Sequence, residues 1–216
     1  MNLFSAILTL VISPTRFAIE RIKHKVSDYG QTIRIWNRFF RCAMLASVVG
    51  LYIVKSGDPI RNARFYAGYF ALWLLPFSRV NELALAFYRD AFQRFDSTSS
   101  NTGITPIQRL RFLVSSYFEV AAQFGIMFFC FPSGFFKQDF HSIVEALYFS
   151  AITISTVGYG DITPTRPPSQ LACMYELAVG FILLVFALGS YLTTSLSSQV
   201  ENTSLLGNRN PPDRSA

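Results

Sequence analysis

The chain has 216 residues, of which 51% are hydrophobic and 15% charged, and its formal net charge is +6 at pH 7. Soluble domains carry roughly 25% charged residues, so this composition argues against a soluble domain and indicates a protein dissolved in lipid. The basic residues lie mostly beside apolar runs instead of on a polar face, which argues against a nucleic-acid partner. The 3 cysteines and 2 histidines have no spacing typical of a metal site or a catalytic group, so we expect neither a cofactor nor enzymatic activity.

Residues 1–35 are predicted to form a cytoplasmic or interfacial segment. Its apolar run, Leu3–Ile12, is too short to cross a bilayer, because a spanning helix takes about 20 residues. An amphipathic helix in the interface, with the following basic residues at the headgroups, is the expected outcome. No positive residue precedes the run and no small-residue cleavage site follows it, so we do not expect it to be removed as a signal peptide.

Residues 36–95 are predicted to form a two-helix accessory membrane region. The first spanning helix is expected from Trp36 to Val54. The second begins at Phe65 and is expected to continue past Pro76 as an amphipathic stretch, because apolar residues recur there at helical spacing. The role of these two helices is left open between a lipid-facing collar, a partner site and a reduced sensor-like domain.

Residues 106–200, after a polar linker at 96–105, are predicted to form one pore module. A third helix is expected from Pro106 to Phe131, because proline suits the first turn of a helix. A short helix is then opened by a capping box, Ser142–Glu145, and ends near Ser155. A fourth long helix is expected from Ser169 to about Leu196. The tail, 201–216, is polar and is expected to be disordered.

The distribution of positive residues predicts the topology. Seven basic residues lie before the first spanning helix or in its early turns, within 16–41, which places the N-terminus in the cytoplasm. Four crossings return the C-terminus to the cytoplasm, so the loop between the third and fourth helices faces outside. The predicted fold is therefore an all-α membrane protein with four transmembrane helices and a re-entrant short helix and loop between the third and fourth. We expect it in the plasma or inner cell membrane.

The segment Thr153–Asp161 reads TISTVGYGD. Here the chain resembles the tetrameric potassium channels, whose selectivity filter has the sequence TVGYG. The resemblance extends over roughly Phe140–Leu196 and implies a filter of five residues in which backbone carbonyls replace the water around a permeant potassium ion. These residues are Thr156, Val157, Gly158, Tyr159 and Gly160, and the first four supply the rings of potassium ligands.

A backbone that aims successive carbonyls at one axis must alternate between ordinary and left-handed conformations. Glycine reaches the left-handed region at little steric cost, and Gly158 and Gly160 lie where that freedom is needed. Because the sequence holds one such segment and a ring needs four, a homotetramer or a mixed tetramer is expected.

The resemblance also implies residues that support the filter. Asp161 is expected to hydrogen-bond to an aromatic side chain on the short helix, and Tyr148 has that position, while Thr153 precedes the filter. Phe149 stands where the family often has tryptophan, and phenylalanine cannot donate a hydrogen bond to Tyr159. The carbonyl end of the short helix is expected to point at the pore centre, where its partial negative charge favours a cation.

In the fourth helix, Gly180 aligns with the glycine at which inner helices of similar channels bend. Close helix packing is the alternative explanation, because small residues serve that purpose in membranes. The side chains expected to face the cavity and the inner mouth are Phe181, Leu184, Leu188 and Leu192, although packing or lipid-facing roles are equally open for each leucine.

Four ionisable residues fall within or near the predicted spans: Arg79, Glu82, Glu119 and Glu176. A bare charge at mid-depth costs at least about 2.5–3.5 kcal/mol, so we expect these residues to pair between helices instead of coordinating the ion. Arg79 can pair with Glu82 on one helix face and can reach Glu119. The arginines do not recur at every third residue of one helix, so no voltage sensor of that type is expected.

The sequence thus predicts a potassium-selective channel subunit that conducts passively and has itself, potassium and lipid as partners. Three alternatives were weighed. A regulatory or non-conducting subunit would assemble with other pore chains, and a separate regulatory subunit is a further partner left open. A membrane enzyme would need a nucleophile, base or metal cluster. A weakly selective cation channel would follow from a filter loosened at Phe149.

Overall fold

The computed structural model describes residues 14–15, 29–53, 74–88 and 106–185. These residues are helical apart from loops and one isolated β-bridge between Phe136 and Pro164. The predicted linker at 96–105, the predicted tail at 201–216 and most of the segment 1–35 lie outside the described residues. The helices, in chain order, are α3 (Tyr29–Ile53), the helix 74–88, α5 (Pro106–Phe129), α6 (Ile143–Ile154) and the helix Pro167–Val185.

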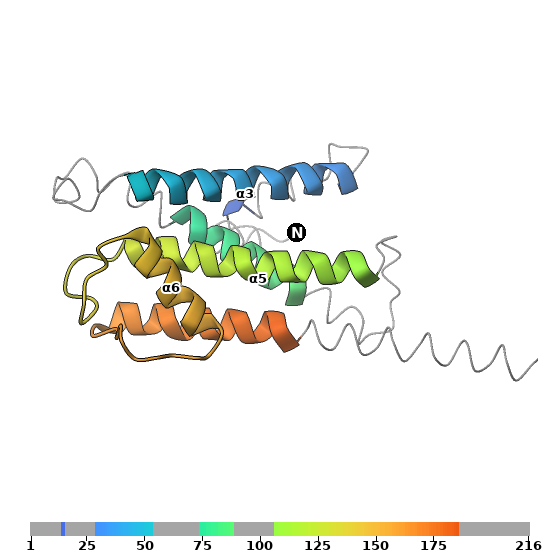
Figure 1. Cartoon of the computed structure of the whole chain (residues 1–216). Coiled ribbons are helices and arrows are strands. Elements are labelled where there is room, and N and C mark those ends of the chain that lie inside the picture. The colour runs from blue at the N-terminus through green and yellow to red at the C-terminus, as the bar shows by residue number, and fades with distance from the viewer. Residues whose placement is uncertain (1–13, 16–28, 54–73, 89–105, 186–216) are drawn as a thin grey trace, which may run out of the picture.

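The long helices lie alongside one another, and successive ones run in opposite directions (Figure 1). In Figure 1, α3 and α5 run one way, and the helices 74–88 and 167–185 run the other way. The short α6 lies across this bundle near one end, between α5 and the helix 167–185. The loop that follows α6 therefore starts part-way along the helix 167–185 and returns to the end of the bundle where that helix begins (Figure 1).

Two of the described helices are long and apolar enough to cross a membrane by length and composition, namely Leu110–Phe129 within α5 and Pro167–Val185. The third helix was predicted from Pro106 to Phe131, and α5 begins at Pro106 and ends two residues earlier, at Phe129. The start at Trp36 predicted for the first helix is wrong, because α3 begins at Tyr29. No proline interrupts the turns between the two positions and arginine is a good helix former, so the predicted regional boundary at residue 35 falls inside α3. The helix 74–88 continues past Pro76, as predicted.

A close crossing joins α5 to α6. Gly125 faces Leu147, and a Cβ at Gly125 would lie 2.7 Å from the Leu147 Cδ2 and 3.0 Å from its Cα. Such distances leave no room for a side chain, so glycine lets the two backbones approach, as small residues do between membrane helices. Buried side chains of α5 fill the space around this crossing, among them Val120, Phe124 and Phe128.

Six phenylalanines, here called the phenylalanine cluster, pack where α5 ends and α6 begins: Phe128, Phe131, Phe135, Phe136, Phe140 and Phe149. The ring centroids of Phe149 lie 5.0 Å from Phe128 and 5.4 Å from Phe136. Next to the cluster, Lys137 N–H donates to the Thr163 carbonyl and Thr165 N–H to the Phe135 carbonyl, each at 2.9 Å. The loop before α6 is thereby fixed to the loop after the predicted filter.

Candidate functional site

The N-terminus of α6 is capped by its own first turn. Ser142 has an extended backbone, and its hydroxyl accepts the Glu145 N–H at 3.3 Å. The Glu145 carboxylate accepts the His141 N–H at 2.8 Å, one residue before the position expected of a capping box. The predicted cap is therefore confirmed, with its reciprocal bond shifted by one residue.

The C-terminus of α6 ends in a Schellman motif that contains the first predicted filter residue. The Thr156 N–H donates to the Thr153 carbonyl at 2.9 Å, and the Val157 N–H donates to the Ile152 carbonyl at 3.0 Å. In this motif the residue after the cap adopts the left-handed conformation and is usually glycine. Here it is Thr156, with φ +60°.

Left-handed residues alternate along the segment that follows. Thr156 has φ +60°, Gly158 +52° and Gly160 +77°, whereas Val157 and Tyr159 between them do not have positive φ. The sequence argument identified the two glycines and missed Thr156, because a β-branched residue at positive φ is a genuine outlier. Its signal in the sequence was its place directly after the end of α6, where a left-handed residue closes the helix.

In this segment, three backbone N–H groups make hydrogen bonds to α6, whereas the carbonyls accept none from the backbone of the described residues. The N–H groups of Thr156, Val157 and Gly158 all donate to carbonyls of α6. The hydrogen bond from Gly158 to the Ile152 carbonyl is 3.1 Å long. Within the described ranges, no backbone N–H donates to a carbonyl of Thr156, Val157, Gly158 or Tyr159. The side chains of Val157 and Tyr159 are 53% and 70% exposed in the single chain. The segment thus presents free oxygens and uncovered apolar groups.

Asp161 and Tyr148 are brought together, as expected from the resemblance. The Asp161 carboxylate accepts a hydrogen bond from the Tyr148 hydroxyl. Partial desolvation raises the pKa of Tyr148, and the bond to Asp161 and its charge raise this pKa further. Phe149, the next residue, is buried in the phenylalanine cluster and is 4% exposed. Because phenylalanine has no polar group, the polar contact on this side is that of Tyr148 with Asp161.

Ile154, the last residue of α6, is held from two sides. The Tyr117 hydroxyl of α5 donates to the Ile154 carbonyl at 3.0 Å. A Cβ at Gly180 would lie 2.6 Å from Ile154 Cγ1. The Ile154 carbonyl is therefore bound by Tyr117, while the expectation that the carbonyl end of α6 points at a pore centre stays a prediction. Tyr117 was missed by the sequence argument, although a tyrosine hydroxyl in an apolar helix usually has a partner.

Gly180 lies on the buried face of its helix, so the structure gives direct support to close packing at this position. Phe181 and Leu184 of the same helix are 69% and 43% exposed in the single chain. Leu188 and Leu192, the other residues predicted to line a cavity, lie outside the described residues.

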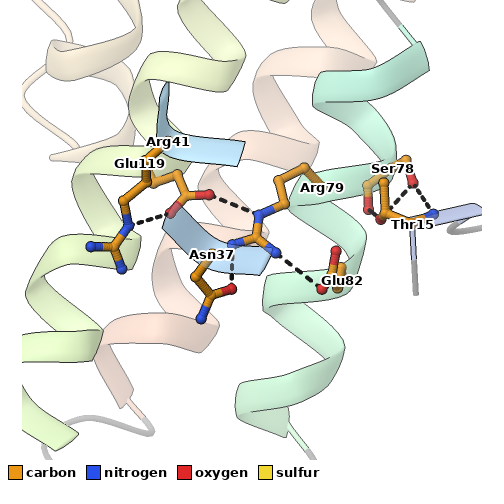
Figure 2. Close-up of polar contacts among 7 residues, drawn as sticks. All are labelled: Thr15, Asn37, Arg41, Ser78, Arg79, Glu82 and Glu119. Atoms are coloured by element: carbon orange, nitrogen blue, oxygen red, sulfur yellow. Dashed lines mark hydrogen bonds and ion pairs between the residues drawn. The ribbon is translucent and has the colours of Figure 1, made fainter. Parts of the chain in front are cut away.

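The charged residues of the accessory region form a buried network with α5 (Figure 2). Arg79 Nε lies 2.8 Å from a Glu119 carboxylate oxygen, and Arg79 Nη1 lies 3.0 Å from Glu82 Oε1. Arg41 of α3 approaches the other Glu119 oxygen at 3.3 Å, and the Asn37 amide oxygen accepts from Arg79 Nη2 at 2.8 Å. The pairings of Arg79 predicted from the sequence are confirmed, and the four charges sum to zero.

The comparisons with known proteins agree with this geometry. Residues 113–195 match the sequence model of a family described as ion channel. Two-pore potassium channel 2 of Arabidopsis thaliana is 40% identical over 70 residues, which are 32% of this chain and 16% of that protein. Two-pore potassium channel 4 of the same plant is 27% identical over 109 residues, 48% of this chain and 38% of that protein. The chain is thus similar to an ion channel family over residues 113–195 and to potassium channels over part of their length.

Another similar protein is the voltage-gated potassium channel regulatory subunit KCNG2 of Gallus gallus, 34% identical over 65 residues, 30% of this chain and 12% of that protein. No solved structure matches the chain. Because the chain spans well under half the length of these curated relatives, its own activity is argued below from its site.

Proposed function

We propose that this chain is a subunit of a potassium-selective channel and conducts potassium passively through a ring of four filter segments, Thr156–Gly160. The observation that carries the proposal is the alternation of left-handed residues at 156, 158 and 160. Together with N–H groups that return to α6, this alternation leaves the carbonyl oxygens of Thr156, Val157, Gly158 and Tyr159 available as ligands. Potassium channels bind the permeant ion with such carbonyls.

A ring of four copies accounts for what a single chain leaves uncovered. Large side chains next to the proposed axis are exposed to solvent in the single chain, where they would normally be covered by other protein: Val157, Tyr159, Phe181 and Leu184. A four-fold assembly about an axis beside the segment and the helix 167–185 would cover them or place them on a cavity. The sequence holds one filter segment, so a homotetramer is the simplest assembly that supplies four.

The proposed membrane arrangement is four crossings, with α6 and the filter segment re-entrant between the third and fourth. The alternating directions of the long helices are compatible with it (Figure 1). Irregular backbone at membrane depth is tolerated where it lines a wet cavity or is covered by protein. The basic residues before and within the first turns of α3 favour cytoplasmic termini and an outward-facing filter.

The test is potassium flux from liposomes that contain the purified full chain, with barium as blocker and with Gly158→Ala as the inactivating variant. Gly134→Ala is the matched control, because both glycines have positive φ and a Cβ at either would meet no atom within 4 Å in the single chain. Both substitutions carry a left-handed penalty of about 1–2 kcal/mol, but only Gly158 belongs to the filter segment. Flux should be lost with Gly158→Ala and kept with Gly134→Ala. Undiminished flux with Gly158→Ala would refute the filter assignment.

Selectivity is tested by the reversal potential of the same preparation in mixed potassium and sodium. A carbonyl-lined filter should give a reversal potential near that of potassium. A value near the midpoint between the two ions would instead indicate a weakly selective cation channel.

A second candidate function is a regulatory subunit that assembles with other pore chains, because several similar proteins carry the description regulatory subunit in their names. The two candidates differ in what the purified protein does alone. Barium-sensitive flux through liposomes that contain this chain only supports the conducting subunit. Flux that requires a second pore-forming chain, with this chain present in the mixed assembly, supports the regulatory one.

A further inference from the structure

A single hydrogen-bonded group joins three elements, namely α5, α6 and the helix 167–185. Ser150 of α6 and Glu176 of the helix 167–185 are both 0% exposed. The Ser150 hydroxyl lies 2.6 Å from the Ala121 carbonyl of α5, and it also contacts Glu176 Oε1. Glu176 Oε2 is buried and has no hydrogen-bond partner among the described residues. The site described above does not account for this carboxyl group.

The number of protons available to the two hydrogen bonds of Ser150 determines whether Glu176 is neutral or ionised. A serine hydroxyl has one proton to donate, and a carbonyl oxygen can only accept. The contact of Ser150 with the Ala121 carbonyl therefore uses the serine proton. The contact of Ser150 with Glu176 then needs a proton from the glutamate, because an ionised carboxylate is an acceptor only. Both contacts are hydrogen bonds at the same time only when Glu176 is a carboxylic acid.

The surroundings of Glu176 agree with a neutral group. The titratable groups that face it are Tyr117 from α5 and Cys173 from its own helix, and α6 contributes the neutral Ser150. No arginine or lysine of the described ranges pairs with it. Glu119, which is buried to a similar degree, instead has two arginines on its carboxylate. An unpaired buried carboxylate would be costly, so such a group takes up a proton.

We propose that Glu176 is a neutral carboxylic acid that donates a hydrogen bond to Ser150, and that this link positions α6, and with it the filter segment, against the helix 167–185. The chain of bonds runs from Glu176 to Ser150 and from Ser150 to the Ala121 carbonyl. It fixes α6 at Ser150, less than two turns before Thr156, the first residue of the filter segment. Glu176 is thus a positioning residue, and the part of the proposal that concerns conduction rests on the proposed function.

The protonation state is tested by infrared difference spectra of the wild-type channel against Glu176→Gln, recorded in H2O and D2O. We expect the wild type to have a protonated carboxyl band that shifts in D2O and is absent from Glu176→Gln. The reference is Glu145→Gln, in which a glutamine keeps the helix cap and a more exposed carboxylate is removed. A carboxylate band lost in Glu176→Gln, like that lost in the reference, would overturn the proposal without any measurement of conduction.

The positioning role is tested by potassium flux and selectivity of Glu176→Gln and Glu176→Leu. The glutamine amide can donate to Ser150 as the acid does, so flux should stay within about twofold of the wild type. Leucine fills similar space but cannot donate a hydrogen bond, so the buried Ser150 oxygen loses its donor. Potassium-selective flux should therefore fall about tenfold, which corresponds to the cost of a buried polar group without a partner. Equal flux and selectivity in the two variants would overturn the positioning role. A protonated band in a wild type that conducts no potassium would refute the proposed function and leave the assignment of the neutral acid standing.

Discussion

Gly180 is the position at which a minimal substitution should move the filter segment. Replacing Gly180 with alanine places a methyl group 2.6 Å from Ile154 Cγ1, well inside van der Waals contact. Ile154 is 2% exposed, and its carbonyl is bound by Tyr117, so it cannot move aside freely. Overpacking a well-filled site costs about 1–3 kcal/mol. Because Ile154 is the last residue of α6, part of this strain should appear as loss of potassium selectivity.

A second substitution provides the compensation that distinguishes packing from a hinge. Ile154→Ala alone leaves a cavity and should cost about 2–5 kcal/mol, but it removes the atom that the Gly180→Ala methyl group meets. The double variant should therefore be more stable than the sum of the single effects predicts, by at least about 1 kcal/mol of coupling.

The assay is a double-mutant cycle on the free energy of unfolding in detergent, with the reversal potential measured in parallel. Additive effects of the two substitutions would refute the contact between Gly180 and Ile154. Unchanged stability together with altered opening in Gly180→Ala would support the alternative that this glycine is a hinge.

Two further predictions concern α5. Glu119→Gln should lower the free energy of unfolding by about 3–5 kcal/mol, because Arg79 is 1% exposed and loses its closest ion-pair partner; Arg41→Gln, at a side chain that is 36% exposed, should cost no more than about 1 kcal/mol. Equal losses in the two variants, measured by denaturation in detergent, would contradict this ranking. Tyr117→Phe should cost about 1 kcal/mol and reduce selectivity, because the Ile154 carbonyl loses its donor; unchanged selectivity would show that α6 is held without this bond.

The features that local sequence rules determine were predicted well. The cap at Ser142, the end of α6 near Ser155 and the need for left-handed glycines at 158 and 160 each follow from a short stretch of residues. The start of α3 was misplaced, because hydrophobicity marks where a helix meets lipid and not where its backbone begins. The pairing of Arg79 with Glu119 was predicted because a buried charge needs a partner and few were available.

Contacts between distant residues were harder to predict. Tyr117 and Ile154 are 37 positions apart, and Ser150 and Glu176 are 26 apart. Each pair depends on how far α6 tilts across its neighbours, which Gly125 and the phenylalanine cluster determine through packing. A sequence shows that a tyrosine or glutamate in an apolar helix needs a partner, but it does not show which helix supplies that partner.

The arrangement of α5 gives the accessory helices one route to the filter segment. Tyr117 and Glu119 are two residues apart, so they point to different sides of α5. Tyr117 binds the last carbonyl of α6, whereas Glu119 binds arginines of α3 and the helix 74–88. A displacement of those two helices would shift Glu119 and, through the same turn of α5, Tyr117 and the end of α6. If the charge network is coupled to the filter in this way, Glu119→Gln should change selectivity in the wild type but add little in a Tyr117→Phe background; equal changes in both backgrounds would exclude this route.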